Sequence, residues 1–228
     1  MTIPLSEPET SAGSSQAAAI GPSEIAAAGV TAPVVAPPER SDWTRLDAAA
    51  KRERLLEAAT EVFARNGIDA PMSVVADAAG AGVASVYRLF ASKRELLAAI
   101  VTERMDQVAV AAQEAASAPG DRWSALTDML TRLVRTQRAD YMMGEARAAV
   151  ADHPDVMAAV TRANEAQERL LADARAEGRL RADATTLDLR LLFAATRAAR
   201  RVEPERWPRM LQLMIDALEA RSTAEQCD

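Results

Sequence analysis

The sequence has very few of the residues that build disulfide-bonded domains and metal centres. Its 228 residues include a single cysteine, Cys227, and a single histidine, His153. One cysteine excludes a disulfide within the chain, and a lone thiol near the end of the sequence suits a reducing compartment. The two residues provide no cluster with metal-ligand spacing, so we expect no metal and no other cofactor.

Aromatic residues are scarce as well, at 4% of the chain. The runs of β-branched and aromatic residues that are typical of strands do not occur. Alanine, which has the highest helix propensity, is instead abundant throughout the sequence. The sequence therefore predicts an all-α fold whose core consists mainly of Leu, Val, Met and Ala side chains.

Long apolar runs are also missing. No segment approaches the roughly 20 apolar residues of a membrane-spanning helix. The sequence begins MTIPLSEPET, with acids and prolines where a signal peptide has positive charge and then an apolar stretch. We therefore expect a cytoplasmic protein that has no membrane partner.

The chain is acidic overall, with a net charge of −6 and a pI near 5.1. Such a total argues against a nucleic-acid partner, because phosphate binding needs local positive charge. The distribution of charge matters more than its sum, however. Between Gly82 and Arg94 the chain has three cations and no acid, so a local site for phosphates is compatible with the acidic total.

Composition and breaks divide the chain into four parts. Residues 1–40, rich in Ala, Pro, Ser and Gly, have no hydrophobic period and are predicted to be a disordered tail. Residues 41–91 and 92–220 show helical spacing of apolar residues and are predicted to be two domains, followed by a free tail over 221–228. About nine helices are expected: Asp42–Asn66, Pro71–Ala79, Gly82–Phe90, one opened by a capping box of Ser92 and Glu95, one capped by Asp121, residues 144–151, Pro154–Glu177, one starting at Asp183 or Thr185, and one opened by Pro204.

The most informative segment is Ser73–Phe90, SVVADAAGAGVASVYRLF. It predicts two short helices joined by a tight turn, and the second helix carries small residues followed by Tyr87 and Arg88. Small side chains let a helix approach the base edges of a DNA groove closely, and Tyr and Arg can hold phosphates. This segment points to a DNA-binding protein.

Four phrases around this segment occur in a fixed order. They are RERLLEAA in the first helix, AAGAG at the turn, YRLF at the end of the third helix and SKRELL at the start of the fourth. The block that contains them, about Arg45–Val101, resembles the N-terminal DNA-binding domain of the TetR family of bacterial transcriptional regulators. The resemblance implies a three-helix domain with a helix-turn-helix, whose second helix, Gly82–Arg88, lies in the major groove.

The residue chemistry and the resemblance together give a set of expected DNA contacts. Val83, Ala84 and Ser85 would face the base edges, where the hydroxyl can hydrogen-bond a base and the apolar groups can touch a thymine methyl. The resemblance implies phosphate contacts from Tyr87 and Lys93. The complete predicted set is Arg45, Val83, Ala84, Ser85, Tyr87, Arg88 and Lys93.

The chain departs from the family's pattern in ways that make this helix weakly polar. Gly82 stands where many relatives have a polar cap, Val83 where they have Lys, and Leu89 where they have His. We therefore expect few direct hydrogen bonds to bases and more reliance on phosphate contacts and DNA shape. For Arg88, an ion pair with an acid such as Asp77 is the alternative expectation.

The C-terminal half resembles the family's regulatory domain, notably in GRLRADATTLDLRLLFAATRAA. The resemblance implies a pocket for a small-molecule effector, and a homodimer formed by the last two helices. The pocket candidates are Trp123, Met129, Met142, Met143, Arg147 and Phe193, of which the apolar ones fit ordinary core positions equally well. The interface candidates are Leu187, Leu191, Trp207, Met210, Leu211, Met214 and Leu218.

The sequence thus predicts a sequence-specific transcriptional regulator, namely a dimeric repressor that a small molecule releases from a palindromic double-stranded DNA operator. An activator is one alternative, and a helical sensor or scaffold that has lost DNA binding is another. No catalytic residues and no enzyme activity are expected, because no Gly-rich phosphate loop, HExxH motif or nucleophile elbow occurs.

Overall fold

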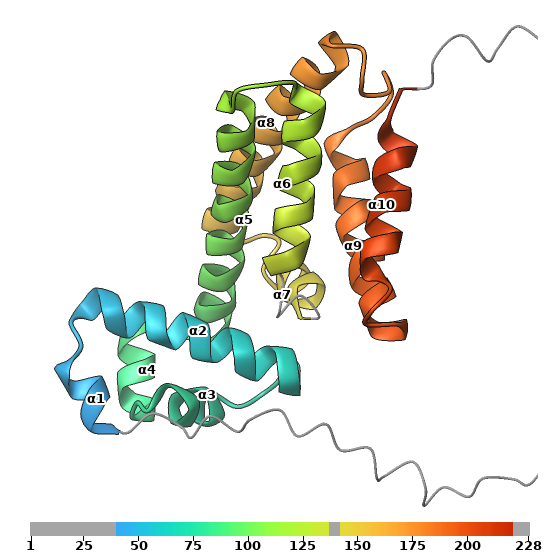
Figure 1. Ribbon diagram of the computed structural model, residues 1–228. Helices are drawn as coiled ribbons and strands as arrows, with labels where there is room; N and C mark the ends of the chain where they lie inside the picture. Colours follow the sequence, from blue (N-terminus) through green and yellow to red (C-terminus); the bar gives the residue numbers. More distant parts are fainter. Residues whose placement is uncertain (1–39, 137–141, 221–228) are drawn as a thin grey trace, which may run out of the picture. The chain divides into compact units, whose positions relative to one another are not determined.

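The computed structural model describes residues 40–136 and 142–220, and ten helices account for most of them (Figure 1). In these residues the only β-type pairing is an isolated bridge between Leu180 and Glu219. The predicted all-α fold is therefore confirmed, with ten helices in place of about nine. The tails predicted over 1–40 and 221–228 lie outside the described residues, except that Arg40 begins the first helix. The helices are α1 (Arg40–Arg45), α2 (Ala48–Asn66), α3 (Met72–Ala79), α4 (Val83–Leu89), α5 (Lys93–Ser117), α6 (Arg122–Thr136), α7 (Met143–Ala149), α8 (Pro154–Ala176), α9 (Thr186–Val202) and α10 (Trp207–Leu218).

The single first helix predicted over Asp42–Asn66 is wrong, because the structure divides it into α1 and α2. The division falls at Asp47, whose backbone is extended and whose carboxylate accepts a hydrogen bond from the amide of Ala50 at 2.8 Å. A short acidic side chain satisfies a first-turn amide of a helix better than it fits a helix interior. Trp43 of α1 is buried in the same cluster as the core of α2–α4.

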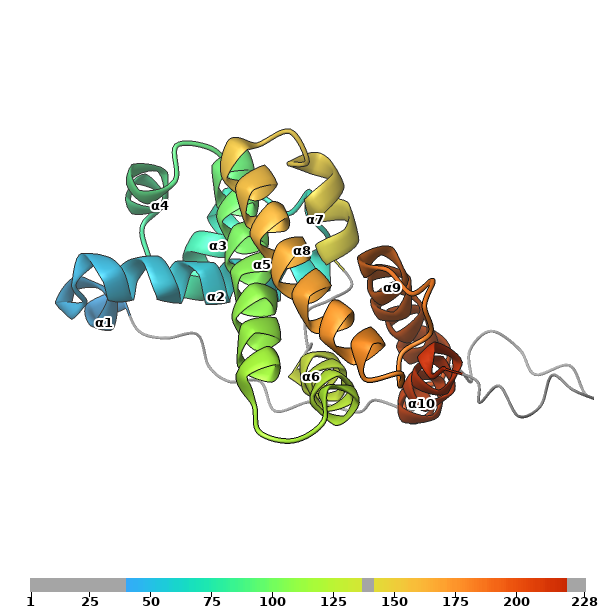
Figure 2. The ribbon, with the colours of Figure 1, turned by 90° about the horizontal axis from the view of Figure 1, so that it is seen from above.

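Helices α5 and α8 lie side by side and run in the same direction (Figure 2), and their contact is the most extensive between any two described helices. Polar pairs join them in register: Glu95 contacts His153 at 3.3 Å, and Asp106 contacts Arg162 at 2.6 Å. Small side chains let two helices approach closely, and both helices bury many of them. The buried alanines of the pair are Ala98, Ala109, Ala111, Ala112, Ala115, Ala159, Ala163, Ala166 and Ala174.

The buried residues form two hydrophobic clusters that meet along α5. Leu96 and Ile100, in the first half of α5, belong to the cluster that also contains the core of α2–α4 and of α7. Ala112, in the second half, belongs to the cluster shared with α6, α8, α9 and α10. Met105 packs against both clusters. The domain boundary predicted at 91/92 falls at the start of α5, yet α5 itself supplies core residues to both clusters.

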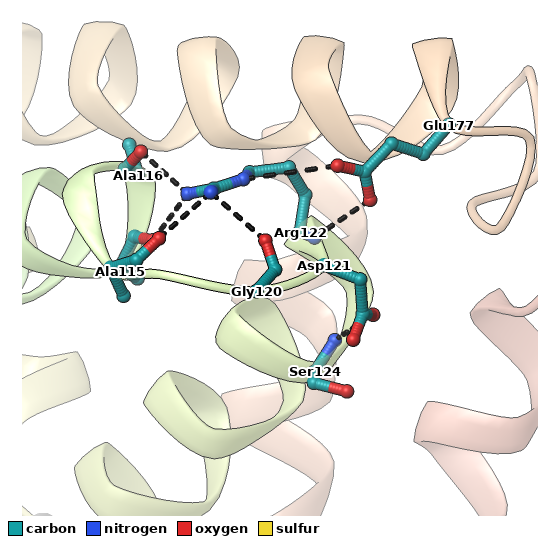
Figure 3. Close-up of polar contacts among 8 residues, drawn as sticks. Ala115, Ala116, Gly120, Asp121, Arg122, Ser124 and Glu177 are labelled. Atoms are coloured by element: carbon teal, nitrogen blue, oxygen red, sulfur yellow. Dashed lines mark hydrogen bonds and ion pairs between the residues drawn. The ribbon is translucent and has the colours of Figure 1, made fainter.

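Arg122, the first residue of α6, holds the turn between α5 and α6 together (Figure 3). Its amide donates to the carboxylate of Glu177, just beyond the end of α8, at 2.7 Å. The last carbonyls of a helix have no intrahelical partner, and a cation is favoured beside them. The guanidinium donates to four carbonyl oxygens at 2.6–3.1 Å, those of Ala115, Ala116, Ala118 and Gly120. The ends of α5 and α8 are thus joined to the start of α6 through one residue.

The predicted cap at Asp121 is confirmed. Its carboxylate accepts a hydrogen bond from the amide of Ser124 at 2.9 Å in the first turn of α6 (Figure 3). Hydrogen bonds from Ser124 hold the pKa of Asp121 below its usual value, because they favour the ionised carboxylate.

Helices α9 and α10 pack against each other (Figure 1). The prediction that Pro204 opens the last helix is wrong, because α10 begins at Trp207 with Pro208 in its first turn. A helix that began at Pro204 would place Pro208 in its interior. There the proline ring would clash with the carbonyl of the preceding turn, and one backbone hydrogen bond of the helix would be lost because proline has no N–H. The end of α10 is bound to the α8–α9 connection, since the amide of Arg181 donates to the carbonyl of Leu218 at 3.0 Å.

Replacing Arg122 with methionine keeps an apolar stem but removes the guanidinium, and we expect this to lower the free energy of unfolding by about 2 kcal/mol. Hydrogen bonds from a charged donor contribute about 1.5–3 kcal/mol, and hydration of the freed carbonyls recovers part of the loss when several are broken. Urea denaturation followed by circular dichroism measures the change.

Arg65→Met is the matched control. Arg65 pairs with Glu61 on the surface of α2, and its side chain is 73% exposed. Such exposed pairs contribute about 0–1 kcal/mol, so the control should lose much less stability. Equal losses in the two variants would contradict the role given to Arg122.

Candidate functional site

The turn between α3 and α4 fixes the relative direction of these two short helices. Gly80 ends α3 in the left-handed region, with φ 68° and ψ 23°, and its amide donates to the carbonyl of Asp77 at 3.1 Å. The amide of Ala81 donates to the carbonyl of Ala76 at 2.8 Å. These two bonds form a Schellman motif, which favours glycine because of its positive φ. The tight turn that the sequence predicted is therefore found.

Helix α4 buries one side and exposes the other. Val86 and Phe90 are 0% and 3% exposed and anchor the helix in the first cluster. Val83 and Tyr87 are 41% and 48% exposed, and Ala84 is exposed beside them. A short helix that leaves an aromatic ring and a valine uncovered has a face available for a partner.

The remaining residues predicted to contact DNA lie on or near α4. Arg88 is exposed and donates to the hydroxyl of half-buried Ser85 at 2.8 Å, in place of the alternative ion pair with Asp77. Lys93 is half-buried at the first position of α5, and Arg45 is the exposed last residue of α1. The structure thus brings six of the seven predicted residues to α4 and the start of α5, and Arg45 lies on a separate helix.

Arg94, the third cation of this segment, fastens α5 to the connection between α7 and α8. Its guanidinium donates to the carbonyl of Ala149 at 2.9 Å and to the carboxylate of Asp152 at 2.6 Å. The hydrogen bond from Arg94 lowers the pKa of Asp152 below its usual value. Arg94 is therefore engaged within the protein and is not a free cation of the α4 face.

A second contact joins the same two segments. Glu95 approaches Nε2 of His153, the N-cap residue of α8, at 3.3 Å. The capping box predicted at the start of α5 is therefore only half formed: the hydroxyl of Ser92 accepts from the amide of Glu95 at 3.2 Å, whereas the Glu95 carboxylate faces His153. The first turn of α5, which carries Lys93, is thus bound to the end of α7 and the start of α8.

A cavity of about 310 Å³ lies among α5, α7, α8 and α9, close to the meeting point of the two hydrophobic clusters. Of the predicted pocket residues, Met143, Arg147 and Phe193 line it. Trp123 and Met129 lie in the second hydrophobic cluster, and Met142 lies in the first. The structure does not bring these three to the cavity, because their side chains fill the space between packed helices.

The cavity wall is strongly cationic. The residues of the described part that line it include four arginines and no Asp or Glu. Burial lowers the pKa of Arg147, and the nearby charge of Arg190 adds to this shift, since both effects disfavour a further positive charge. The four arginines are Arg104, Arg147, Arg190 and Arg197.

Sequence reasoning missed three of these arginines, although one signal was present. Arg190, Phe193 and Arg197 follow each other at spacings of three and four, so they share one face of α9. That face lines the cavity. Arg104 on α5 had no comparable signal, because only packing decides which part of a long helix borders a space.

Helices α9 and α10 expose an apolar surface. Leu187 and Leu191 are 50% and 55% exposed, and Met210 is 38% exposed. Trp207 and Met214 are half-buried, while Leu211 and Leu218 are buried within the chain at 3% and 8% exposure. Two exposed residues that the sequence prediction omitted, Val202 and Leu213, are 80% and 47% exposed.

Two findings limit the chemistry of the described residues. No group of three or more His, Cys, Asp and Glu in residues 40–136 and 142–220 has an arrangement that could hold a metal ion. None of the helices in these residues has both the length and the apolar character needed to cross a membrane.

Residues 55–100 match the model of a protein family described as bacterial regulatory proteins, tetR family. The matched segment contains the Schellman turn, all of α4 and the first turns of α5. No curated protein matches the chain in sequence.

Solved structures are similar over most of the chain. A TetR transcription regulatory protein from Mycobacterium vanbaalenii is 28% identical, with a TM-score of 0.54, over 80% of this chain and 100% of that one. A TetR family transcription regulator from Marinobacter aquaeolei VT8 is 21% identical, with a TM-score of 0.58, over 76% and 97%. SmeT, the repressor of the Stenotrophomonas maltophilia multidrug efflux pump SmeDEF, is 22% identical, with a TM-score of 0.53, over 79% and 94%. The similarity in fold therefore extends well beyond residues 55–100.

The crowded cations of the cavity predict a salt-dependent stability. Arg147 and Arg190 repel each other, and added salt screens that repulsion. Arg147→Gln is therefore expected to raise Tm by about 1–2 °C at low ionic strength and to reduce the rise in Tm that salt produces. Differential scanning fluorimetry at two NaCl concentrations measures both effects.

Arg169→Gln is the control, because it removes an exposed arginine of α8 that does not line this cavity. Its salt response should stay close to that of the unaltered protein. An unchanged salt response in Arg147→Gln would show that the repulsion is not significant.

Proposed function

Since the chain belongs to the TetR family of bacterial regulatory proteins, we propose that it is a repressor that binds a double-stranded DNA operator as a homodimer and leaves it when a small-molecule effector binds. The proposal makes the protein a regulator and not an enzyme, acting in the cytoplasm where the bacterial chromosome lies. The observation that carries it is the exposed side of α4, with Tyr87 and Val83 uncovered at the second helix of a helix-turn-helix.

In this proposal α4 enters the major groove, and its small residues Val83 and Ala84 approach the base edges. Tyr87 and Lys93 hold phosphates on either side, and Arg45 reaches the backbone from α1. The hydrogen bond between Ser85 and Arg88 occupies part of the hydrogen-bonding capacity of these two side chains. Specificity then depends mainly on apolar contacts with thymine methyl groups and on DNA shape.

The charge distribution supports binding of DNA at this end of the chain. Residues 40–95 contain nine Arg and Lys and eight Asp and Glu, a net charge of +1, although the whole chain carries −6. Residues 1–39 contain four Glu and neither Arg nor Lys. The acidic total therefore arises outside the segment that would approach phosphates.

A homodimer is supported by the apolar surface of α9 and α10. Leu187, Leu191 and Val202 follow one side of α9, and Met210 and Leu213 are exposed on α10. Packing this surface against a second copy would form a four-helix bundle and cover it from water. A dimer would present two α4 helices to two half-sites, which lie about 34–36 Å apart in operators of this kind.

The contacts around α7 support a route from the effector to DNA. Helix α7 supplies Met143 and Arg147 to the cavity wall, and Ala149 at its end accepts a hydrogen bond from Arg94. Arg94 follows directly after Lys93. An effector that moves α7 or α5 would therefore shift Lys93 and change the affinity for DNA, provided that it binds the two arrangements unequally.

Lys93→Gln is expected to weaken binding to the operator about tenfold or more, because two phosphate contacts are lost per dimer. The slope of log Kd plotted against log salt concentration should decrease by about two. The operator is first obtained by selecting genomic fragments with the purified protein, and affinity is then measured by fluorescence anisotropy at several salt concentrations.

Arg65→Gln serves as the control, because Arg65 is exposed and paired with Glu61 on α2. We expect its affinity and its salt slope to match those of the unaltered protein within twofold. Failure to enrich any genomic fragment, with or without small molecules, would overturn the proposal and favour a helical sensor without DNA binding.

Leu191→Glu is expected to convert the dimer into a monomer, because it places a charge in the centre of an apolar interface. Light scattering coupled to size-exclusion chromatography measures the molecular mass. Val110→Glu changes an equally exposed apolar residue on α5, which is 51% exposed, and should remain dimeric. A Leu191→Glu variant that keeps the mass of a dimer would place the interface elsewhere.

A further inference from the structure

Three of the arginines that border the cavity among α5, α7, α8 and α9 stand apart from the arginines that form ion pairs. Arg162 contacts Asp106 and Arg94 contacts Asp152, each at 2.6 Å. In the described residues no such ion pair forms with Arg147, Arg190 or Arg197. Three guanidinium groups therefore border one space without an acid to balance them.

Two of these cations are partly shielded from water, which strengthens their interaction with an anion. Arg147 on α7 and Arg197 on α9 are half-buried, whereas Arg190 on α9 borders the same space and is exposed. Gln167, which is 4% exposed, adds an amide to the wall from α8. Charge-assisted hydrogen bonds are stronger where water is partly excluded, and arginine binds a carboxylate through two parallel N–H groups.

The other part of the wall is apolar. Met105 and Val108 on α5, Val160 on α8 and Phe193 on α9 border the space. Its volume of about 310 Å³ holds about ten non-hydrogen atoms, if each takes roughly the 30 Å³ that a water molecule occupies in the liquid. A ligand that complements both parts of the wall combines an anionic group with a short apolar body.

We propose that the effector is an amphipathic monocarboxylate of about ten non-hydrogen atoms, whose carboxylate binds Arg147, Arg190 and Arg197 and whose apolar part lies against Met105 and Phe193. This inference rests on the proposed function, because it assigns a chemical class to the effector of that same cavity. The negative charge of the carboxylate offsets the repulsion among the arginines, because each guanidinium group is attracted to it. The carboxylate also draws α7 and α9 towards each other, because its two oxygens bond to arginines from both helices.

Octanoate is the probe, since it has ten non-hydrogen atoms and one carboxylate. Isothermal titration calorimetry on the full-length protein compares it with octan-1-ol and methyl octanoate, which keep the chain but lack the charge. Octanoate is expected to bind at least about tenfold more tightly than either neutral compound, because hydrogen bonds to a charged group are stronger than hydrogen bonds between neutral groups. 3-Phenylpropionate and octyl phosphate are titrated in parallel, to vary the apolar body and the anionic group.

Arginine variants test where the anion binds. Arg147→Gln and Arg190→Gln should each weaken octanoate binding about tenfold or more and leave the weak binding of octan-1-ol unchanged. Arg169→Gln, outside the cavity, should bind octanoate normally. Gly144→Leu tests the space itself: Gly144 borders the cavity, and a Cβ added there meets no atom within 4 Å, so a leucine side chain is expected to narrow the cavity and weaken binding of every probe.

The outcomes separate this inference from the proposed function. If octanoate binds no better than its neutral counterparts, if the arginine variants bind normally, or if none of the three anions binds at millimolar concentration, the inference is wrong. DNA binding by the ligand-free protein is measured independently on the selected operator. Operator binding without anion binding would overturn only the inference, whereas arginine-dependent anion binding without any operator would overturn only the proposed function.

Discussion

The parallel contact between α5 and α8 is the constraint on which the rest of the structure depends. Alanine side chains on both helices allow close approach, and the contacts of Glu95 with His153 and of Asp106 with Arg162 fix their register. Arg122, the first residue of α6, joins the ends of the two helices through the last carbonyls of α5 and through Glu177. Because α5 is long, it passes out of one hydrophobic cluster into the other. Helices α2–α4 at one end and α6, α9 and α10 at the other are therefore held through this pair.

The same constraint supports the proposed route from the cavity to the exposed face of α4. Met105 touches both clusters and also borders the cavity, so a ligand there contacts the helix that both clusters share. The bonds of Arg94 to Ala149 and Asp152 continue this path to the first turn of α5. Coupling of this kind requires two arrangements of the α5–α7 contact with different affinities for the ligand. Packed helices shift as units, and this makes such arrangements discrete.

Much of the fold follows from local sequence. Spacing of apolar residues predicts most helices, and Gly80 predicts the turn between α3 and α4 because that turn needs a positive φ. Apolar spacing and proline position alone placed two helix boundaries wrongly. Asp47 ends α1 by capping α2, although the apolar period continues past it. Pro208, and not Pro204, occupies the first turn of α10, because a helix tolerates proline only there.

The sequence by itself determined the helical fold, the helix-turn-helix and the exposed residues of α4, because these depend on periodicity, caps and turns within a few neighbouring residues. Only the tertiary structure decided the roles of the arginines. Arg94 and Arg147 look alike as charged residues in helical segments, yet one is bound to Asp152 and the other borders a cavity without an acid. That difference depends on which helices lie opposite each other, and contacts between residues more than fifty positions apart fix it.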